Sequence, residues 1–472
     1  MSFKKDFIKN VARFGGYTYM VQVLEFVSTI ILSRIISPQE YGFVALILVF
    51  SGFIGVFNHI GIAHAIIRSD YSDEKIRHFF SLSIWIGMFL FVCFSLLAYP
   101  IALFYNNMKL LAPTMFLGVV FISQSLSFVP ASLAKKELKF NLIGSANIIQ
   151  TVFLLVFTII LAFLGFSYWS LIIPMAFSPL VRYFYFVNKV KFKPAFYGPG
   201  AALRLLKEIK SLAGSITVSG ILNYWNRNTD NLVIGKFFGE ISLGLYNRAY
   251  KFIYLVNRLI VGIFGVVLYP SLKKLKDTGG DTNSEFLTIV GAISLLTYPI
   301  SFILILFGEP MVLILWGPDW IGVAQYLPYI GVLIMIQPIL SSMTDYYVLQ
   351  GKEKTVMHIA VISSILTISA IITGAFFSVV HVILFYAIAN IVLLIPKMIL
   401  GFYYALNYRV AEILNFWLPK IILTSFLLYF IHSGMDLYKT VVIGIYPLHL
   451  LHSQRNDMNK IIKMFKKRLT RG

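Results

Sequence analysis

Residues 42–67 read GFVALILVFSGFIGVFNHIGIAHAII and contain no Lys, Arg, Asp or Glu. About 20 apolar residues in a helix are enough to cross the hydrocarbon core of a bilayer. Runs of this length recur along the whole chain of 472 residues, of which 58% are hydrophobic and only 13% are charged. A soluble protein of this size needs more polar surface than this composition supplies. The runs do not alternate as the strands of a membrane barrel do, so the sequence predicts an all-α polytopic membrane protein.

We expect about fourteen transmembrane helices, and the last of them is the weakest. The stretch from Lys439 to His452 is short and contains Pro447, which makes it a candidate for a truncated or re-entrant helix. The predicted spans cover residues 12–36, 42–67, 79–104, 110–133, 143–165, 167–187, 211–236, 243–270, 285–308, 323–349, 356–378, 381–404, 414–432 and 438–451.

The basic residues predict the orientation of these spans. When each residue near a span end is assigned to the nearer side, 32 of the 40 Lys and Arg residues fall on one side, Lys397 among them, four fall on the other side and four are assigned to the interior of spans. Cytoplasmic loops carry the excess of Lys and Arg, so both termini are expected in the cytoplasm of a bacterial cell. The same bias accounts for the net charge of +20 without a nucleic-acid partner. The single cysteine, Cys93, can form no internal disulfide, and we find no cleavable signal peptide.

The longest internal loop divides the chain into two halves. It holds Pro194, Gly198, Pro199 and Gly200 before the amphipathic stretch ALRLLKEIKSL. The sequence predicts an N-terminal lobe of spans 1–6 (1–190), a cytoplasmic linker with an amphipathic helix (191–210) and a C-terminal lobe of spans 7–12 (211–408). A helix pair (409–452) and a basic cytoplasmic tail (453–472) follow.

The two halves also resemble each other weakly in sequence. A shift of 202 residues lays SRIISPQEYGFV from Ser33 onto GKFFGEISLGLY from Gly235, and Gly42 then meets Gly244. Both halves start on the cytoplasmic side, which indicates a parallel repeat about an axis along the membrane normal. The same shift places Glu25 of the first span on Arg227 of the seventh.

Four cations fall inside predicted spans. On insertion scales a charge at the bilayer centre costs roughly 2.5–3.5 kcal/mol, so these side chains should face protein or a wet cavity. Arg227 lies in NYWNRNTDN (223–231), and Arg248, Lys251 and Arg258 form a stripe along the next span. Cations around a cavity suit an anionic ligand such as a phosphate or pyrophosphate. Two alternatives stay open: Arg227 pairs with Asp230 to hold helices together, and Arg248 and Lys251 extend to the outer interface.

Weaker candidates complete the predicted cavity. Glu25 is a lone intramembrane acid, whereas Asn58 and His59 are better explained as helix-contact groups, and Asp345 as an interfacial residue. The predicted polar cavity residues are Glu25, Asn58, Asn223, Asp230 and Asn231. The histidines lack metal-ligand spacing, and we find no nucleotide-binding or hydrolase motif, so no metal, cofactor or enzymatic activity is expected.

Several stretches resemble bacterial polysaccharide flippases, the Wzx-type exporters of lipid-linked repeat units. They are LSRIISPQEYGFVALILVFSGFIGVFNHIGIAHAIIR (32–68), RNTDNLVIGKFFGEISLGLYNRAYKF (227–252), VLYPSLKKLKD and WGPDWIGVAQYLPYIGVL. The resemblance covers about the first 410 residues and implies the superfamily of the multidrug (MATE) exporters and lipid II flippases. It implies two six-helix lobes and a C-terminal pair around a cavity that opens alternately to each side. The short final span departs from this pattern.

The resemblance also implies a substrate, an oligosaccharide on undecaprenyl diphosphate. Arg227, Arg248, Lys251 and Arg258 would then attract the diphosphate, and Glu25 would pair with Arg227 or couple an ion such as H⁺ or Na⁺. The partners expected are the lipid-linked substrate, the bilayer and other polysaccharide assembly proteins. One alternative is an ion-coupled exporter of cationic drugs, which the basic cavity disfavours. Another is a membrane glycan polymerase or glycosyltransferase, which the short outward loops disfavour.

Overall fold

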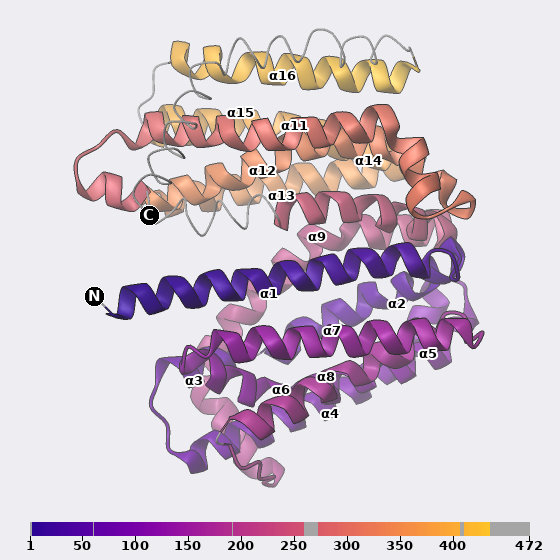
Figure 1. Cartoon of the computed structure of the whole chain (residues 1–472), viewed down its shortest axis with the longest axis vertical. Helices are drawn as coiled ribbons and strands as arrows, with labels where there is room; N and C mark the ends of the chain where they lie inside the picture. The colour runs from indigo at the N-terminus through magenta and orange to yellow at the C-terminus, as the bar shows by residue number, and fades with distance from the viewer. Residues whose placement is uncertain (1, 60, 191, 259–271, 406–409, 435–472) are drawn as a thin grey trace. The chain divides into compact units, whose positions relative to one another are not determined.

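The computed structural model describes residues 2–59, 61–190, 192–258, 272–405 and 410–434, and these residues contain helices and no β-strand (Figure 1). The predicted last span at 438–451 lies outside them. The helices are α1 (Ser2–Leu32), α2 (Pro38–Val56), η1 (Phe57–His59), α3 (Ile62–Arg68), α4 (Asp73–Phe104), η2 (Met108–Leu110), α5 (Leu111–Leu117), α6 (Val119–Lys136), α7 (Phe140–Phe163), α8 (Trp169–Lys189), α9 (Pro199–Val256), α11 (Thr282–Leu315), η4 (Pro318–Tyr326), α12 (Leu327–Leu349), α13 (Glu353–Ala375), α14 (Val379–Val392), α15 (Leu394–Pro396), η5 (Lys397–Ala405) and α16 (Val410–Ser433).

Within the described ranges, nine helical segments are long and apolar enough to cross a membrane. They confirm the predicted class, an all-α multi-pass membrane protein. The spans predicted at 211–236 and 414–432 fall in α9 and α16, and that at 12–36 falls mostly in α1. The span at 243–270 begins in α9 and continues outside the described residues. These three helices are not among the nine. The total of fourteen stays a prediction.

Local sequence signals fix where the membrane helices begin. Ser37 and Glu40 form a capping box at the start of α2, in which each side chain bonds the backbone N–H of the other residue. Pro38 occupies the first turn, where a missing N–H costs nothing. Ser72 caps α4 through the N–H of Lys75, and Asp281 caps α11 in the same way.

The described helices form two compact units, Met1–Gly244 and Leu245–Gly472. The sequence placed its linker earlier, at 191–210, but the structure starts α9 at Pro199 and continues it past the predicted linker. Its backbone leaves helical geometry at Gly239, where φ is 79°. Glycine adopts this left-handed conformation without a steric penalty. The break falls where the sequence separates the spans at 211–236 and 243–270. The predicted lobe boundaries stay a prediction.

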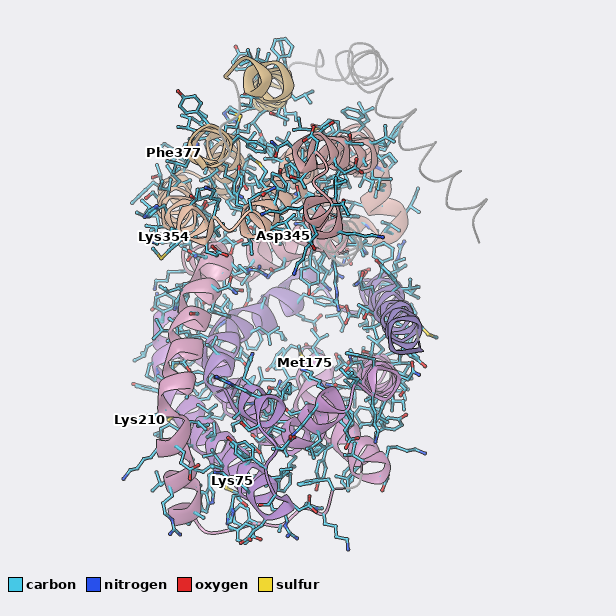
Figure 2. All side chains as sticks on the ribbon, turned by 90° about the vertical axis from the view of Figure 1, so that its left-hand side faces the viewer. Lys75, Met175, Lys210, Asp345, Lys354 and Phe377 are labelled. Atoms are coloured by element: carbon cyan, nitrogen blue, oxygen red, sulfur yellow. The ribbon has the colours of Figure 1, made fainter. Side chains whose placement is uncertain are left out.

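Ion pairs join three basic segments at one end of the first unit. Lys75, labelled in Figure 2, lies 2.7 Å from the Glu208 carboxylate of α9. Lys136, at the end of α6, lies 2.8 Å from the carboxylate of Asp70. The hydrogen bond from Lys136 and its positive charge hold the pKa of Asp70 below its usual value. The sequence predicts all three segments on the same side. The side of the membrane that this end faces stays a prediction.

The opposite end of the first unit holds one of the few basic residues predicted there. The Lys236 ammonium donates a hydrogen bond to the backbone oxygen of Phe104, the last residue of α4. Nearby, the Asn107 side chain lies 3.5 Å from the Glu240 carboxylate. Because α4 begins beside Lys75 and ends beside Lys236, these two lysines lie at opposite ends of the helix, as the sequence predicts.

Within the first unit, α2 crosses the part of α9 that follows the break at Gly239, and the two backbones are in contact. A methyl group at Gly42 would collide with the backbone oxygen of Glu240, and one at Gly244 would collide with the backbone oxygen of Pro38. The 202-residue shift equates Gly42 with Gly244 and Pro38 with Glu240. The two collisions are therefore the same contact made twice, as expected where equivalent segments meet about a local two-fold axis. This reciprocity supports the internal repeat.

Candidate functional site

The polar segment of α9, residues 223–231, lies alongside the membrane-spanning helix α2. It runs antiparallel to α2, because Gly220 contacts Val56, Gly52 contacts Tyr224, and Gly235 contacts Leu46. The segment 223–231 therefore lies between the levels of Gly52 and Leu46, inside Pro38–Val56, which is one of the candidate membrane spans. The sequence predicted these residues inside the membrane, and the contacts with α2 support that depth.

The polar segment has a packed face and an exposed face. The rings of Tyr224 and Trp225 lie 6.0 and 5.1 Å from the ring of Phe53, and the Tyr224 hydroxyl donates to the backbone oxygen of Val49. Asp230 is only 4% exposed and accepts the N–H of Asn231 at 2.8 Å.

The exposed face presents Arg227 together with Asn223, which precedes it by one helical turn. Among the residues that the structure describes, Arg227 makes no ion pair. An exposed guanidinium at this depth costs about 2.5–3.5 kcal/mol if it faces lipid. The cost disappears if it faces water or an anionic ligand. This favours a wet cavity over lipid beside Arg227.

The other polar residues predicted in the first unit lie apart from this face. Glu25 is exposed on α1. Asn58 is buried, and its amide donates to the Gln124 side chain of α6 at 3.3 Å, so it joins helices as the sequence analysis favours. The structure describes the backbone of His59 and not its side chain.

The basic stripe of Arg248, Lys251 and Arg258 lies in the second unit, and its members differ in exposure. Arg248 is 2% exposed, and its guanidinium lies 4.2 Å from the centre of the Trp320 ring and 5.4 Å from that of Trp316. A guanidinium on an aromatic face is stabilised by the ring quadrupole. Trp320 belongs to η4, which connects the end of α11 to the start of α12. Arg248 of α9 therefore lies level with the ends of these two helices. Lys251 is exposed.

Arg258 lies deeper than Arg248 and beside a polar network. Its neighbour Asn257 donates to the Gln337 side chain at 3.2 Å, and Gln337 donates to the Tyr386 hydroxyl at 2.8 Å. Gln337 lies at the midpoint of α12 and Tyr386 at the midpoint of α14. Arg258 is half-buried and lies 5.8 Å from the centre of the Tyr254 ring. The sequence did not identify Gln337 or Tyr386, although each is a polar group inside an apolar span.

Lys397 is a further charged residue whose position the sequence analysis misjudged. It was counted among the basic residues of one side, but the structure buries it to 7% exposure at the start of η5. Its ammonium donates to the backbone oxygen of Leu340 and to the Thr344 hydroxyl, the latter at 2.9 Å. Asp345, predicted at the interface, is exposed on the same helix, α12. Lys397 therefore fastens η5 to α12.

Replacing Lys397 with methionine is expected to leave the melting temperature in detergent unchanged or to raise it. An apolar side chain of similar size removes the cost of burying a charge. The Leu340 oxygen also keeps its bond from the Thr344 hydroxyl at 3.2 Å. Lys397→Ala leaves a cavity instead and is expected to destabilise the protein by about 2–5 kcal/mol. Equal losses in the two variants would show that the charge itself stabilises the fold.

Comparison with known proteins places the chain among membrane proteins of polysaccharide synthesis. The sequence model of a family described as polysaccharide biosynthesis protein matches residues 31–325. The chain is 22% identical over 486 residues to the succinoglycan biosynthesis transport protein ExoT of Rhizobium meliloti (strain 1021), and the alignment covers 98% of this chain and 97% of that protein. It is 24% identical over 386 residues to the lipopolysaccharide biosynthesis protein WzxC of Escherichia coli (strain K12), covering 79% of this chain and 76% of that protein.

A solved structure has a similar fold. The lipid II flippase MurJ in an inward closed conformation matches with a TM-score of 0.70 and 16% sequence identity, over 94% of this chain and 99% of that chain. At this identity the similarity concerns the fold alone. It confirms the fold that the sequence resemblance implied.

Proposed function

The chain belongs to the polysaccharide biosynthesis protein family, and from this premise we propose that it is a flippase for lipid-linked oligosaccharide. It moves repeat units on undecaprenyl diphosphate from the cytoplasmic to the outer leaflet of the bacterial cell membrane, by alternating access and with both termini in the cytoplasm. Its relatives support the proposal, because one is named a succinoglycan biosynthesis transport protein and the fold match is a lipid II flippase.

The exposed arginine of α9 at mid-membrane depth carries this proposal. The lipid tail of the substrate can stay in the bilayer, but the diphosphate and the sugars must cross the hydrocarbon without their hydration. A guanidinium replaces that hydration for a diphosphate, because its planar donors form two parallel hydrogen bonds to phosphate oxygens. Arg227 is exposed and makes no ion pair among the described residues, so it remains available for such a ligand.

The other predicted cations have different roles in the proposal. Arg258 is assigned to binding of the diphosphate inside the membrane, and the exposed Lys251 to its arrival or departure near the helix ends. Arg248 is buried against Trp320, so its part is to position η4. Asn223 lies one turn from Arg227 and adds a neutral donor. The proposal also includes coupling to H⁺ or Na⁺ and contacts with other assembly proteins. We assign no residue to either.

Reconstituted protein provides the test. Proteoliposomes carrying a fluorescent undecaprenyl-diphosphate oligosaccharide in the inner leaflet are expected to expose it to an external quencher much faster than protein-free liposomes. A fluorescent cationic drug is expected to cross at the same rate in both preparations. Facilitated movement of the cation without movement of the lipid, tested with and without pH and Na⁺ gradients, would replace the flippase with a drug exporter.

A further inference from the structure

A pocket of about 460 Å³ opens inside the first unit. Its walls come from α2, α5, α6, α7 and α8, and Figure 2 labels Met175, one of the α8 residues among them. Pockets of about 300–1,000 Å³ are typical of small-molecule sites. We propose that this pocket binds uncharged sugar rings of the substrate, through the side-chain amides of Gln124 and Gln150. This inference rests on the proposed function and adds a second subsite to it.

The two amides have unused hydrogen-bonding groups. The Gln124 carbonyl accepts from Asn58 at 3.3 Å, and the Gln150 amide donates to Ser178 at a long 3.5 Å. No hydrogen bond involves the Gln124 NH₂ or the Gln150 carbonyl within the described part of the chain, and neither atom is among its buried unsatisfied groups. One donor group and one acceptor therefore remain for a ligand, which suits a sugar hydroxyl that both donates and accepts.

These polar groups lie near the middle of membrane-spanning helices, where a polar atom without a hydrogen-bond partner is costly. Gln150 and Ser178 are at the midpoints of α7 and α8, both candidate membrane spans, and Gln124 is near the middle of the span Met108–Lys136. In the absence of water, an unsatisfied polar group at this depth costs several kcal/mol. A water-filled pocket that exchanges its water for hydroxyl groups avoids this cost both with and without substrate.

The lining contains no charged residue, which separates this pocket from a diphosphate site. Besides the amides, its polar groups are the hydroxyls of Ser51 and Ser178, and apolar residues with the ring of Phe121 complete the wall. An anion gains little from neutral walls, whereas a sugar ring presents both hydroxyls and apolar C–H faces. The chemistry of the walls therefore favours the neutral part of the substrate.

The pocket lies beside the arginine that the proposed function uses. Gly52 lines the pocket and contacts the Tyr224 ring, and Arg227 follows Tyr224 by three residues on α9. Three residues correspond to about 4.5 Å along a helix. A diphosphate at Arg227 and the sugars attached to it can therefore extend from α9 into the pocket. The geometry needs no residue of the second unit.

Binding measurements in detergent can test the sugar subsite apart from transport. One probe is the lipid-linked oligosaccharide fraction purified from the source organism, and the other is undecaprenyl diphosphate without sugar. The wild-type protein is expected to bind the glycosylated probe more tightly. Gln124→Leu and Gln150→Leu should each reduce that preference about three- to tenfold, the equivalent of one neutral hydrogen bond, and leave binding of the bare diphosphate lipid unchanged.

Controls separate this role from helix packing. Gln325→Leu removes an exposed side-chain amide of η4, which does not line the pocket, and it should keep the preference. A preference that survives in both glutamine variants, with or without a fall in melting temperature, would make the amides helix-packing groups and overturn the subsite. Wild-type protein that binds both probes equally would also overturn it while leaving the proposed function intact. Wild-type protein that binds neither probe would remove the proposed function and this inference together.

Discussion

Replacing Arg227 with alanine is expected to slow movement of the fluorescent undecaprenyl-diphosphate oligosaccharide in proteoliposomes by about 10- to 100-fold. A hydrogen bond to a charged group contributes about 1.5–3 kcal/mol, and each 1.4 kcal/mol is a factor of ten. The melting temperature should not fall, because Arg227 is exposed and makes no ion pair among the residues described. Arg227→Lys keeps the charge without the planar pair of donors, so it should retain an intermediate rate.

The matched control removes a positive charge from another part of the chain. Lys354 is exposed in the first turn of α13 and is labelled in Figure 2. Lys354→Ala should therefore transport at the wild-type rate. Arg258→Ala should resemble Arg227→Ala, since Arg258 adjoins the network at the centre of α12. Wild-type transport by a correctly inserted Arg227→Ala protein would assign Arg227 to structure and remove the observation on which the proposed function rests.

The membrane class and the internal repeat were predictable because they depend on local composition and on spacing. Long apolar runs have one stable placement, across a bilayer, whatever their tertiary contacts. The alignment of Gly42 with Gly244 needed only a constant shift, and the structure adds that the two glycines meet. The break at Gly239 was also marked locally, because it falls between two predicted spans.

The contacts of individual polar residues were not predictable in the same way. Arg248 rests on Trp320, which is distant in sequence, and no periodicity within α9 identifies that partner. Lys397 lies in the last third of a predicted span and was counted at the end of that span. Its burial depends on the packing of η5 on α12, which the sequence does not show. Gln124 is the only side-chain amide of its predicted span, and Gln150 follows Asn147 by three residues in the next span. Amides in such spans are usually helix-contact groups. Only their convergence on one pocket from α6 and α7 distinguishes them, and convergence is a tertiary property.

Replacing Gly42 with alanine is expected to destabilise the protein by about 1–3 kcal/mol and to lower its melting temperature in detergent. The added methyl group would meet the backbone oxygen of Glu240, and a backbone atom cannot move aside as a flexible side chain can. Gly244→Ala should have a similar effect, because it makes the reciprocal contact with Pro38. The double variant should cost less than the two single changes together, since one separation of the helices relieves both collisions.

Gly55→Ala is the matched control on the same helix. The nearest atom to an added methyl group there is a Phe121 ring carbon at 4.0 Å, an ordinary contact. Alanine is favoured over glycine in a helix by roughly 0.5–1 kcal/mol, so this variant should be unchanged or slightly more stable. The two substitutions on α2 are thus expected to have opposite signs. Equal stability of Gly42→Ala and Gly55→Ala would mean that α2 and α9 do not cross at Gly42, and the internal repeat would lose the reciprocal contact that supports it.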